Sequence, residues 1–157
     1  MTGRMYSATF EEVSTPTPMP RDFFQIEVTS VNHAILIHSM SITQSSDVDD
    51  EELEISYRVD LSFGIGGTEV TAAPLQVGDP AFSGHVYTNA SKGTGTAAEL
   101  GMSQFNILQG FHKVFSPNER LLVPTYDGVK TYVFLLTLPN SVADDLTFSG
   151  TIVFEEI

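Results

Sequence analysis

Residues 53–63 carry the feature that most constrains this chain, a strict alternation of apolar and polar side chains. The apolar positions are Leu53, Ile55, Tyr57, Val59, Leu61 and Phe63, and the polar positions between them are Glu54, Ser56, Arg58, Asp60 and Ser62. A period of two residues is that of a β-strand, whose successive side chains point to opposite faces of a sheet. The segment therefore predicts an antiparallel strand with one face on a core and the other face in water.

The same alternation recurs in residues 6–10, 24–28 and 146–154. Residues 34–37 and 132–138 are apolar at consecutive positions, which predicts central strands or strands covered by a neighbour. Weaker strand signals fall at residues 68–72, 84–88, 102–109, 112–115 and 120–124. We therefore predict an all-β fold, an antiparallel β-sandwich or jelly-roll-like barrel of about eight to ten short strands with minimal helix.

Turn-forming residues separate these segments. Glycines at 64–67 predict a hairpin turn, and Asp127 followed by Gly128 predicts another. Residues 89–96 are small and polar with no hydrophobic anchor, which predicts a mobile loop tip. Only residues 96–102 indicate a turn of helix.

The length of 157 residues is that of one domain, so we expect residues 1–157 to form a single β domain. Prolines alternate with other residues over 15–20, which predicts an extended and stiff connector. Residues 1–20 are interpreted as an N-terminal arm followed by this proline-rich connector. The alternative is that residues 6–10 form an edge strand of the same domain.

The charge of the chain restricts its partners. It has 20 acidic and 7 basic residues, a net charge of -13 and no cysteine. Such a chain repels nucleic acid and anionic membranes, so we expect it to bind neither. The missing thiols exclude disulfides and zinc–thiolate sites. The chain has no run of apolar residues long enough to cross a membrane and no apolar leader segment, and we expect it to be made in a cytoplasm.

An acidic run is the first candidate for chemistry: Asp47, Asp49, Asp50, Glu51, Glu52 and Glu54. Calcium needs six to eight oxygen ligands that converge on one point. The spacing departs from that of an EF-hand loop, and neighbouring side chains entering a strand point to opposite faces. We favour a solvated acidic loop, and calcium binding stays open as the alternative.

The histidines and serines form no recognisable catalytic pattern. No pair at metal-ligand spacing occurs among His33, His38, His85 and His112. His38 is predicted to share a strand face with Leu36, Met40 and Ile42, as a core or interface histidine with one hydrogen bond. Ser83 lies two residues before His85, but no third group is evident to orient that histidine. We therefore predict no catalytic residue, no metal site and no cofactor, and we expect a protein that is not an enzyme.

Four stretches together resemble small β-rich virion proteins of tailed bacteriophages. They are Gly-Arg-Met-Tyr-Ser-Ala-Thr-Phe at 3–10, Ile-Thr-Gln-Ser-Ser-Asp at 42–47, Pro-Leu-Gln-Val-Gly-Asp-Pro-Ala-Phe at 74–82 and Phe-Ser-Gly-Thr-Ile-Val-Phe-Glu-Glu at 148–156. The resemblance implies a capsid cement or decoration protein, located on the capsid exterior. Its implied partners are the major capsid protein and copies of itself, as a trimer. A tail, neck or fibre-associated β-module is the alternative, and a carbohydrate-binding β-sandwich is a third.

Under this resemblance, the N-terminal arm and the connector are the segments that reach neighbouring proteins. Termini and proline-rich segments have no core of their own and gain order by adding to another chain. The predicted interface residues are Arg4, Met5, Tyr6, Phe10, Pro16, Pro18 and Pro20.

Overall fold

The computed structural model of the chain describes residues 3–15, 20–45, 51–62, 64–140 and 146–157. Within these ranges the regular structure consists of twelve strands and no helix. The strands are β1 Arg4–Thr15, β2 Arg21–Val28, β3 Ile35–Gln44, β4 Glu52–Asp60, β5 Thr68–Val70, β6 Ala73–Pro74, β7 His85–Ser91, β8 Gly101–Asn106, β9 Phe111–Val114, β10 Leu121–Val123, β11 Tyr132–Leu138 and β12 Leu146–Glu156.

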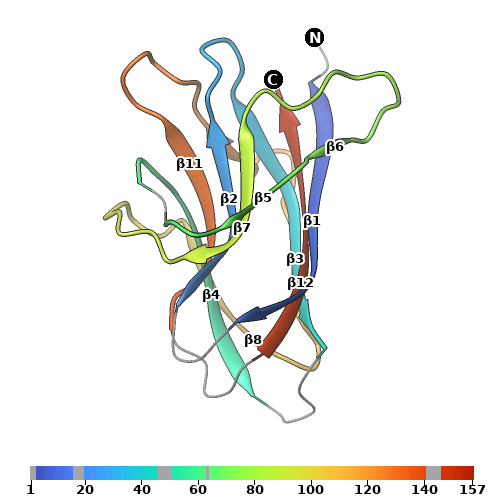
Figure 1. The fold of residues 1–157 in the computed structure, drawn as a ribbon, viewed down its shortest axis with the longest axis vertical. Helices are drawn as coiled ribbons and strands as arrows, with labels where there is room; N and C mark the ends of the chain where they lie inside the picture. The colour runs from blue at the N-terminus through green and yellow to red at the C-terminus, as the bar shows by residue number, and fades with distance from the viewer. Residues whose placement is uncertain (1–2, 16–19, 46–50, 63, 141–145) are drawn as a thin grey trace.

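The strands form two antiparallel sheets that pack as a sandwich, which confirms the predicted fold class. The first sheet has the order β10-β3-β12-β1-β6, with β9 also paired to β3, and the second has the order β5-β7-β2-β11-β4-β8. Figure 1 shows the two sheets facing each other, with both chain ends at the same end of the molecule. The two-residue β6 was not predicted, because two residues are too few to display a period.

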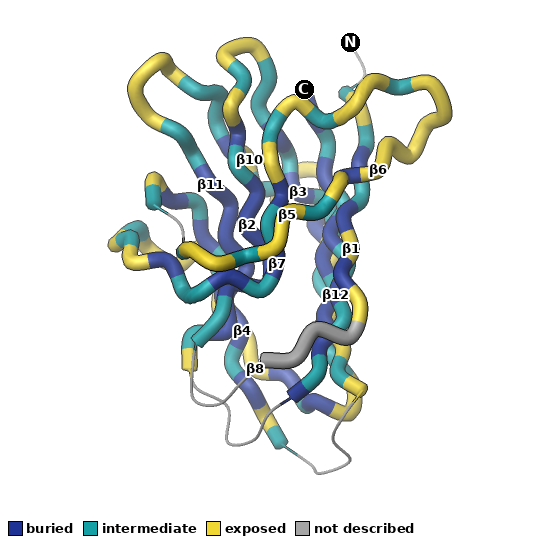
Figure 2. The backbone as a smooth tube through the Cα atoms, in the orientation of Figure 1, coloured by how far each residue is buried: buried dark blue, intermediate teal, exposed yellow. Residues whose placement is uncertain are grey.

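Aromatic side chains fill the space between the sheets. Phe10 of the first sheet lies 5.2 Å from Phe24 of the second, and Phe148 lies 4.9 Å from Phe23 in the same way, measured between ring centroids. Such tilted ring pairs add to the stability that burial of the rings provides. Figure 2 shows buried positions along the strands of both sheets and exposed positions concentrated in the loops. The predicted central strand at 132–138 is confirmed, because β11 lies between β2 and β4.

The N-terminal segment is a strand of the sandwich. β1 pairs with β12 from Arg4 to Thr15, and β6 pairs with its other edge at Tyr6 and Ser7. Tyr6 is 0% exposed and Phe10 is 6% exposed. The assignment of these two side chains to an interface is therefore corrected: they belong to the core, because the alternation of residues 6–10 directs them inward.

A β-bulge corrects the predicted face of His38. Ser39 pairs with Val153 and Ile37 pairs with Phe154, so His38 is an extra residue on β3. A bulge shifts the alternation by one position. As a result, Met40 and Ile42 point into the core, whereas the partly exposed His38 lies on the other face. An alternation pattern read from the sequence continues through such a bulge, and the face after it is then assigned wrongly.

Two turns and a helical segment also differ from the sequence predictions. The turn at Asp127 and Gly128 joins β10 in the first sheet to β11 in the second, and the glycines at 64–67 join β4 to β5, which do not pair. Neither turn closes a hairpin. Residues 96–100 form no helix, and β8 begins at Gly101. Turn chemistry marks where a chain bends, but the next strand's partner depends on the whole sheet order.

Removal of residues 1–14 tests the role of β1. We expect the shortened chain to lose its cooperative unfolding transition, because Tyr6, Ala8 and Phe10 leave the core and one edge of β12 loses its partner. Thermal unfolding followed by circular dichroism measures this, with removal of residues 1–3 as the control that should retain the transition. A folded 15–157 chain would contradict the assignment of β1 to the core.

Candidate functional site

The polar side of β4 is buried, contrary to the prediction that this face lies in water. Ser56, Arg58 and Asp60 are 0%, 4% and 7% exposed. The segment between β7 and β8, residues 92–100, makes hydrogen bonds to this face and covers it. The strand predicted at residues 53–63 is confirmed as β4, which ends at Asp60, and Leu61 after it is half exposed. The cover over the polar side of β4 comes from a segment that is distant in the sequence, so the period alone does not reveal it.

Asp22 of β2 is the acceptor at the centre of this covered face. Its carboxylate accepts hydrogen bonds from Thr137 Oγ1 at 2.6 Å, Gln25 Nε2 at 2.8 Å and the backbone N–H of Gly93 at 3.0 Å. Burial raises the pKa of Asp22 above its ordinary value, and these three hydrogen bonds partly oppose the rise. The carboxylate thus links two strands of the second sheet to the covering segment.

Arg58 of β4 is the cation of the cluster. Its guanidinium donates to the carbonyl of Gly93 at 3.1 Å and lies 3.2 Å from the carboxylates of both Asp60 and Glu99. Asp60 also accepts the backbone N–H of Ala97. A Cβ atom at position 95 would collide with the Asp60 carboxylate, so a glycine is needed where the segment crosses it. The charged groups of the cluster are thus engaged in holding the cover in place.

These contacts correct the prediction of a mobile tip at residues 89–96. Residues 89–91 complete β7, and the buried Gly93 is bonded to both Asp22 and Arg58. A polar loop without apolar anchors can still be fixed by buried hydrogen bonds. No signal in the sequence marks this arrangement, because Arg58 occupies a polar position of the alternation as an exposed residue would.

A second cluster joins the two chain ends. Buried Glu156 accepts hydrogen bonds from the backbone N–H of Ser83 at 3.1 Å and from the Ser83 hydroxyl, and it lies 3.6 Å from Arg4. The neighbouring Glu155 accepts from the backbone N–H of Gly3 at 3.1 Å and lies 2.9 Å from His38 Nε2. The prediction of one hydrogen bond for His38 is confirmed, and its partner is a carboxylate.

The structure gives Ser83 and His85 different partners. The Ser83 hydroxyl bonds to Glu156, whereas His85 Nδ1 lies 2.6 Å from Glu69 Oε1 on β5. Across the described ranges, no group of three or more His, Asp or Glu side chains has the geometry to hold a metal ion. Three members of the acidic run, Asp47, Asp49 and Asp50, lie outside the described residues, so calcium binding there stays untested.

The remaining predicted interface residues are described only in part. Arg4 is exposed and paired with Glu156, Met5 is partly buried on β1, and Pro20 is partly exposed before β2. Pro16 and Pro18 lie outside the described residues.

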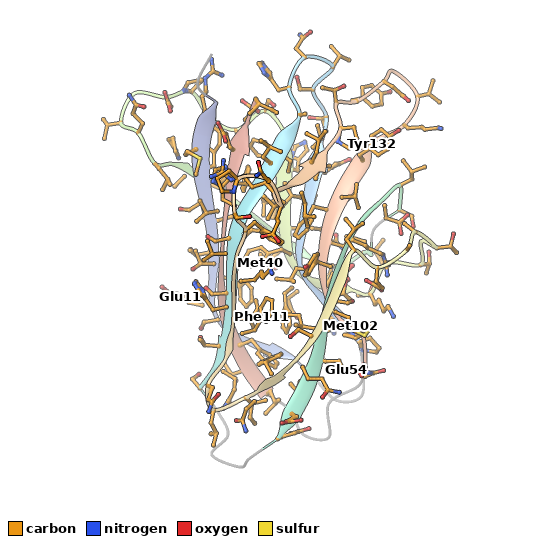
Figure 3. The ribbon with its side chains drawn as sticks, turned by 180° about the vertical axis from the view of Figure 1, so that it is seen from behind. Glu11, Met40, Glu54, Met102, Phe111 and Tyr132 are labelled. Atoms are coloured by element: carbon orange, nitrogen blue, oxygen red, sulfur yellow. The ribbon has the colours of Figure 1, made fainter. Side chains whose placement is uncertain are left out.

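A cleft of about 540 Å³ lies between the edge strands of the two sheets, β8 and β9. Each strand pairs on one side only among the described residues, β8 with β4 and β9 with β3. Figure 3 shows Phe111 of β9 directed between the sheets, and Met102 on β8 is exposed. This cleft is the surface that sequence reasoning missed, because no local pattern tells which strands end a sheet.

Comparisons with known proteins give no relative for this chain. No family model matches it, and no curated protein or solved structure matches it. Among the described residues there is no helix with the length and apolar character needed to cross a membrane.

Substitution of Asp22 tests the buried carboxylate. Asp22→Ala leaves three donors without their acceptor and should lower the free energy of unfolding by about 3 kcal/mol. Asp22→Asn should cost about 1 kcal/mol or less, since an amide can accept two of these bonds and donate to the Thr137 hydroxyl. Urea unfolding at neutral pH measures both, and equal losses would contradict the hydrogen-bonding role.

The pH dependence of Asp22 has a defined sign. Because folding raises its pKa above 3.8, its contribution to stability is complete below that value and is lost as pH rises through the folded-state pKa. The stability difference between wild type and Asp22→Asn should therefore fall as pH rises above about 4. Asp127→Asn is the control: backbone hydrogen bonds lower the pKa of Asp127, so its contribution is lost only as pH falls below about 4, and its stability difference should stay level where that of Asp22 falls. A difference that rises with pH for Asp22 would contradict its burial.

Substitution of Arg58 tests the anchoring of the cover. Arg58→Ala leaves the carboxylate of Asp60 without its partner and should cost about 3–5 kcal/mol. Glu99→Gln should cost about 1 kcal/mol or less, since Glu99 is at the solvent side of the cluster. Hydrogen exchange at residues 92–97 should rise in Arg58→Ala alone. Unchanged exchange there would show that other contacts hold the segment.

Proposed function

We propose that the protein is a non-enzymatic structural component of a bacteriophage particle, a capsid cement or decoration protein. In this role it binds the outer shell and stabilises contacts between neighbouring major capsid subunits. It is made in the host cytoplasm and is located on the capsid exterior, with the major capsid protein and further copies of itself as partners. The resemblance of residues 3–10, 42–47, 74–82 and 148–156 to small virion proteins of tailed phages supports the proposal.

The structural observation that carries the proposal is the pair of open sheet edges at the cleft between β8 and β9. An edge strand presents backbone N–H and C=O groups that an extended segment of another chain can pair with. Met102, Ser103 and Gln104 are exposed along β8, so a partner has access to this edge. Strand addition suits a cement protein, because the bound segment then belongs to the shell and the sandwich holds it.

The negative net charge of the chain supports a location on the outside of the capsid shell. A net charge of -13 disfavours contact with packaged DNA and favours approach to basic patches on other proteins. Rigidity is a second feature that supports the proposal, because the buried cluster around Asp22 and Arg58 fixes the outer face of the second sheet. A rigid face is suited to a protein that must keep its shape against its neighbours.

The proposal is tested on particles of the phage that encodes this chain. Quantitative mass spectrometry of purified heads and purified tails should find the protein on heads, at a copy number comparable with that of the capsid subunits. A handful of copies confined to tails would overturn the cement assignment and favour the tail, neck or fibre module. Absence from particles, together with binding of the isolated chain to a glycan array, would favour the carbohydrate-binding alternative.

Substitution at the open edge tests how the shell is bound. Met102→Lys should lower the occupancy of added protein on undecorated heads about tenfold, because a buried lysine would lose its hydration when a strand is added. Val31→Lys, at an exposed valine between β2 and β3, is the matched control and should bind as wild type does. Equal binding by both variants would exclude β8 as the docking edge.

A further inference from the structure

The loop between β6 and β7 presents an apolar tip. Asp79 N–H donates to the Gln76 carbonyl at 3.2 Å, and Gly78 has a φ of 97°, which places Val77 at the outer corner of a tight turn. Val77 is fully exposed and Leu75 is more than half exposed. Figure 1 shows this loop projecting away from the two sheets beside the N-terminus. We call residues 75–78 the apolar tip.

The loop that carries the apolar tip is tied down on both sides. Leu75 N–H donates to the Met5 carbonyl at 2.8 Å, and the Tyr6 hydroxyl donates to the Pro80 carbonyl at 3.0 Å. Both anchors lie on β1, which is paired to β12 on one side and to β6 on the other. The tip is therefore held in its exposed position before any partner arrives, and a contact made by it would lose little conformational entropy.

An apolar groove of about 520 Å³ lies elsewhere on the molecule. It is bounded by β4, residues 96–100, β10 and the start of β11. Val59 and Tyr132 line it, and three half-exposed leucines surround it: Leu61, Leu100 and Leu122. The volume is in the range of sites that enclose small ligands, so it has room for two aliphatic side chains of one turn.

The described residues supply both an exposed apolar tip and an apolar groove, and this pairing on one chain points to a second copy as the occupant of the groove. A net charge of -13 makes copies repel one another, so a contact between them has to bury uncharged apolar surface to offset the repulsion. Residues 71–78 contain no charged side chain, and the charged residue that lines the groove, Asp60, is paired with Arg58. The apolar tip and the groove thus match each other in polarity on an otherwise acidic protein.

We propose that the apolar tip of one copy inserts Leu75 and Val77 into the groove of the next copy. Figure 3 shows Tyr132, which lines the groove, on the opposite side of the molecule from the loop that carries the tip. The contact is therefore heterologous, and repetition of it gives a closed ring or an open chain. The inference deepens the proposed function, since it names the surfaces through which the copies of the protein on a shell contact each other.

Sedimentation velocity of the purified full chain tests the contact without any phage particle. Wild type should self-associate as its concentration rises to about 1 mM. Val77→Asp and Leu122→Asp should each weaken the association at least about tenfold, and Val77→Asp mixed with Leu122→Lys should recover it. Val31→Asp is the matched control, with an exposed valine outside both surfaces, and should associate as wild type does.

Engineered cysteines test the register of the contact, because the natural chain has none. Under mild oxidation, a mixture of Val77→Cys and Leu122→Cys chains should form the mixed disulfide faster than either chain forms its own. Val31→Cys mixed with Leu122→Cys is the control and should form little.

A monomeric wild type at about 1 mM would overturn the inference, and so would equal effects of Val77→Asp and Val31→Asp. These results leave the proposed function intact if the chain still decorates heads. Loss of head decoration in Val77→Asp from a chain that is monomeric throughout would assign the apolar tip to the capsid subunit instead. Self-association without any binding to particles would keep this inference and overturn the proposed function.

Discussion

The pairing of the first strand with the last holds this sandwich together. β1 and β12 are neighbours in the first sheet, and every other strand lies between them in the sequence. Their inward side chains, among them Tyr6 and Phe154, supply much of the aromatic core. Because this contact joins the two ends of the chain, the first sheet is complete only when both ends are in place.

The second sheet depends on a polar interaction as well as on the core. Its outer face contains Asp22, Arg58 and Asp60, which would be costly to bury alone. The segment at 92–100 supplies the backbone groups that satisfy them, and they in turn fix that segment. The sandwich therefore has a third, partial layer, held by hydrogen bonds and ion pairs where the other two layers are held by apolar packing.

The surfaces available for partners follow from these two constraints. At β8 and β9, each of which pairs on one side only among the described residues, backbone groups are open to another chain. Where loops are anchored to β1 or cover the second sheet, apolar side chains such as Val77 and Leu100 are presented from fixed positions. Both kinds of surface suit contacts with other proteins, and both result from the arrangement of the sheets and not from a local motif.

The alternation of apolar and polar side chains was enough to predict an antiparallel all-β fold, either a sandwich or a barrel, and to locate nearly all the strands. It was enough because the two faces of a strand experience different surroundings, and residues such as Leu53 and Ile55 record that difference locally. The sequence did not reveal which strands pair, that His38 is an extra residue in a bulge, or that Arg58 lies beneath a distant segment. These features depend on contacts between residues far apart in the chain. A period of two residues tells which face of a strand is apolar and which is polar, but not which other part of the molecule covers each face.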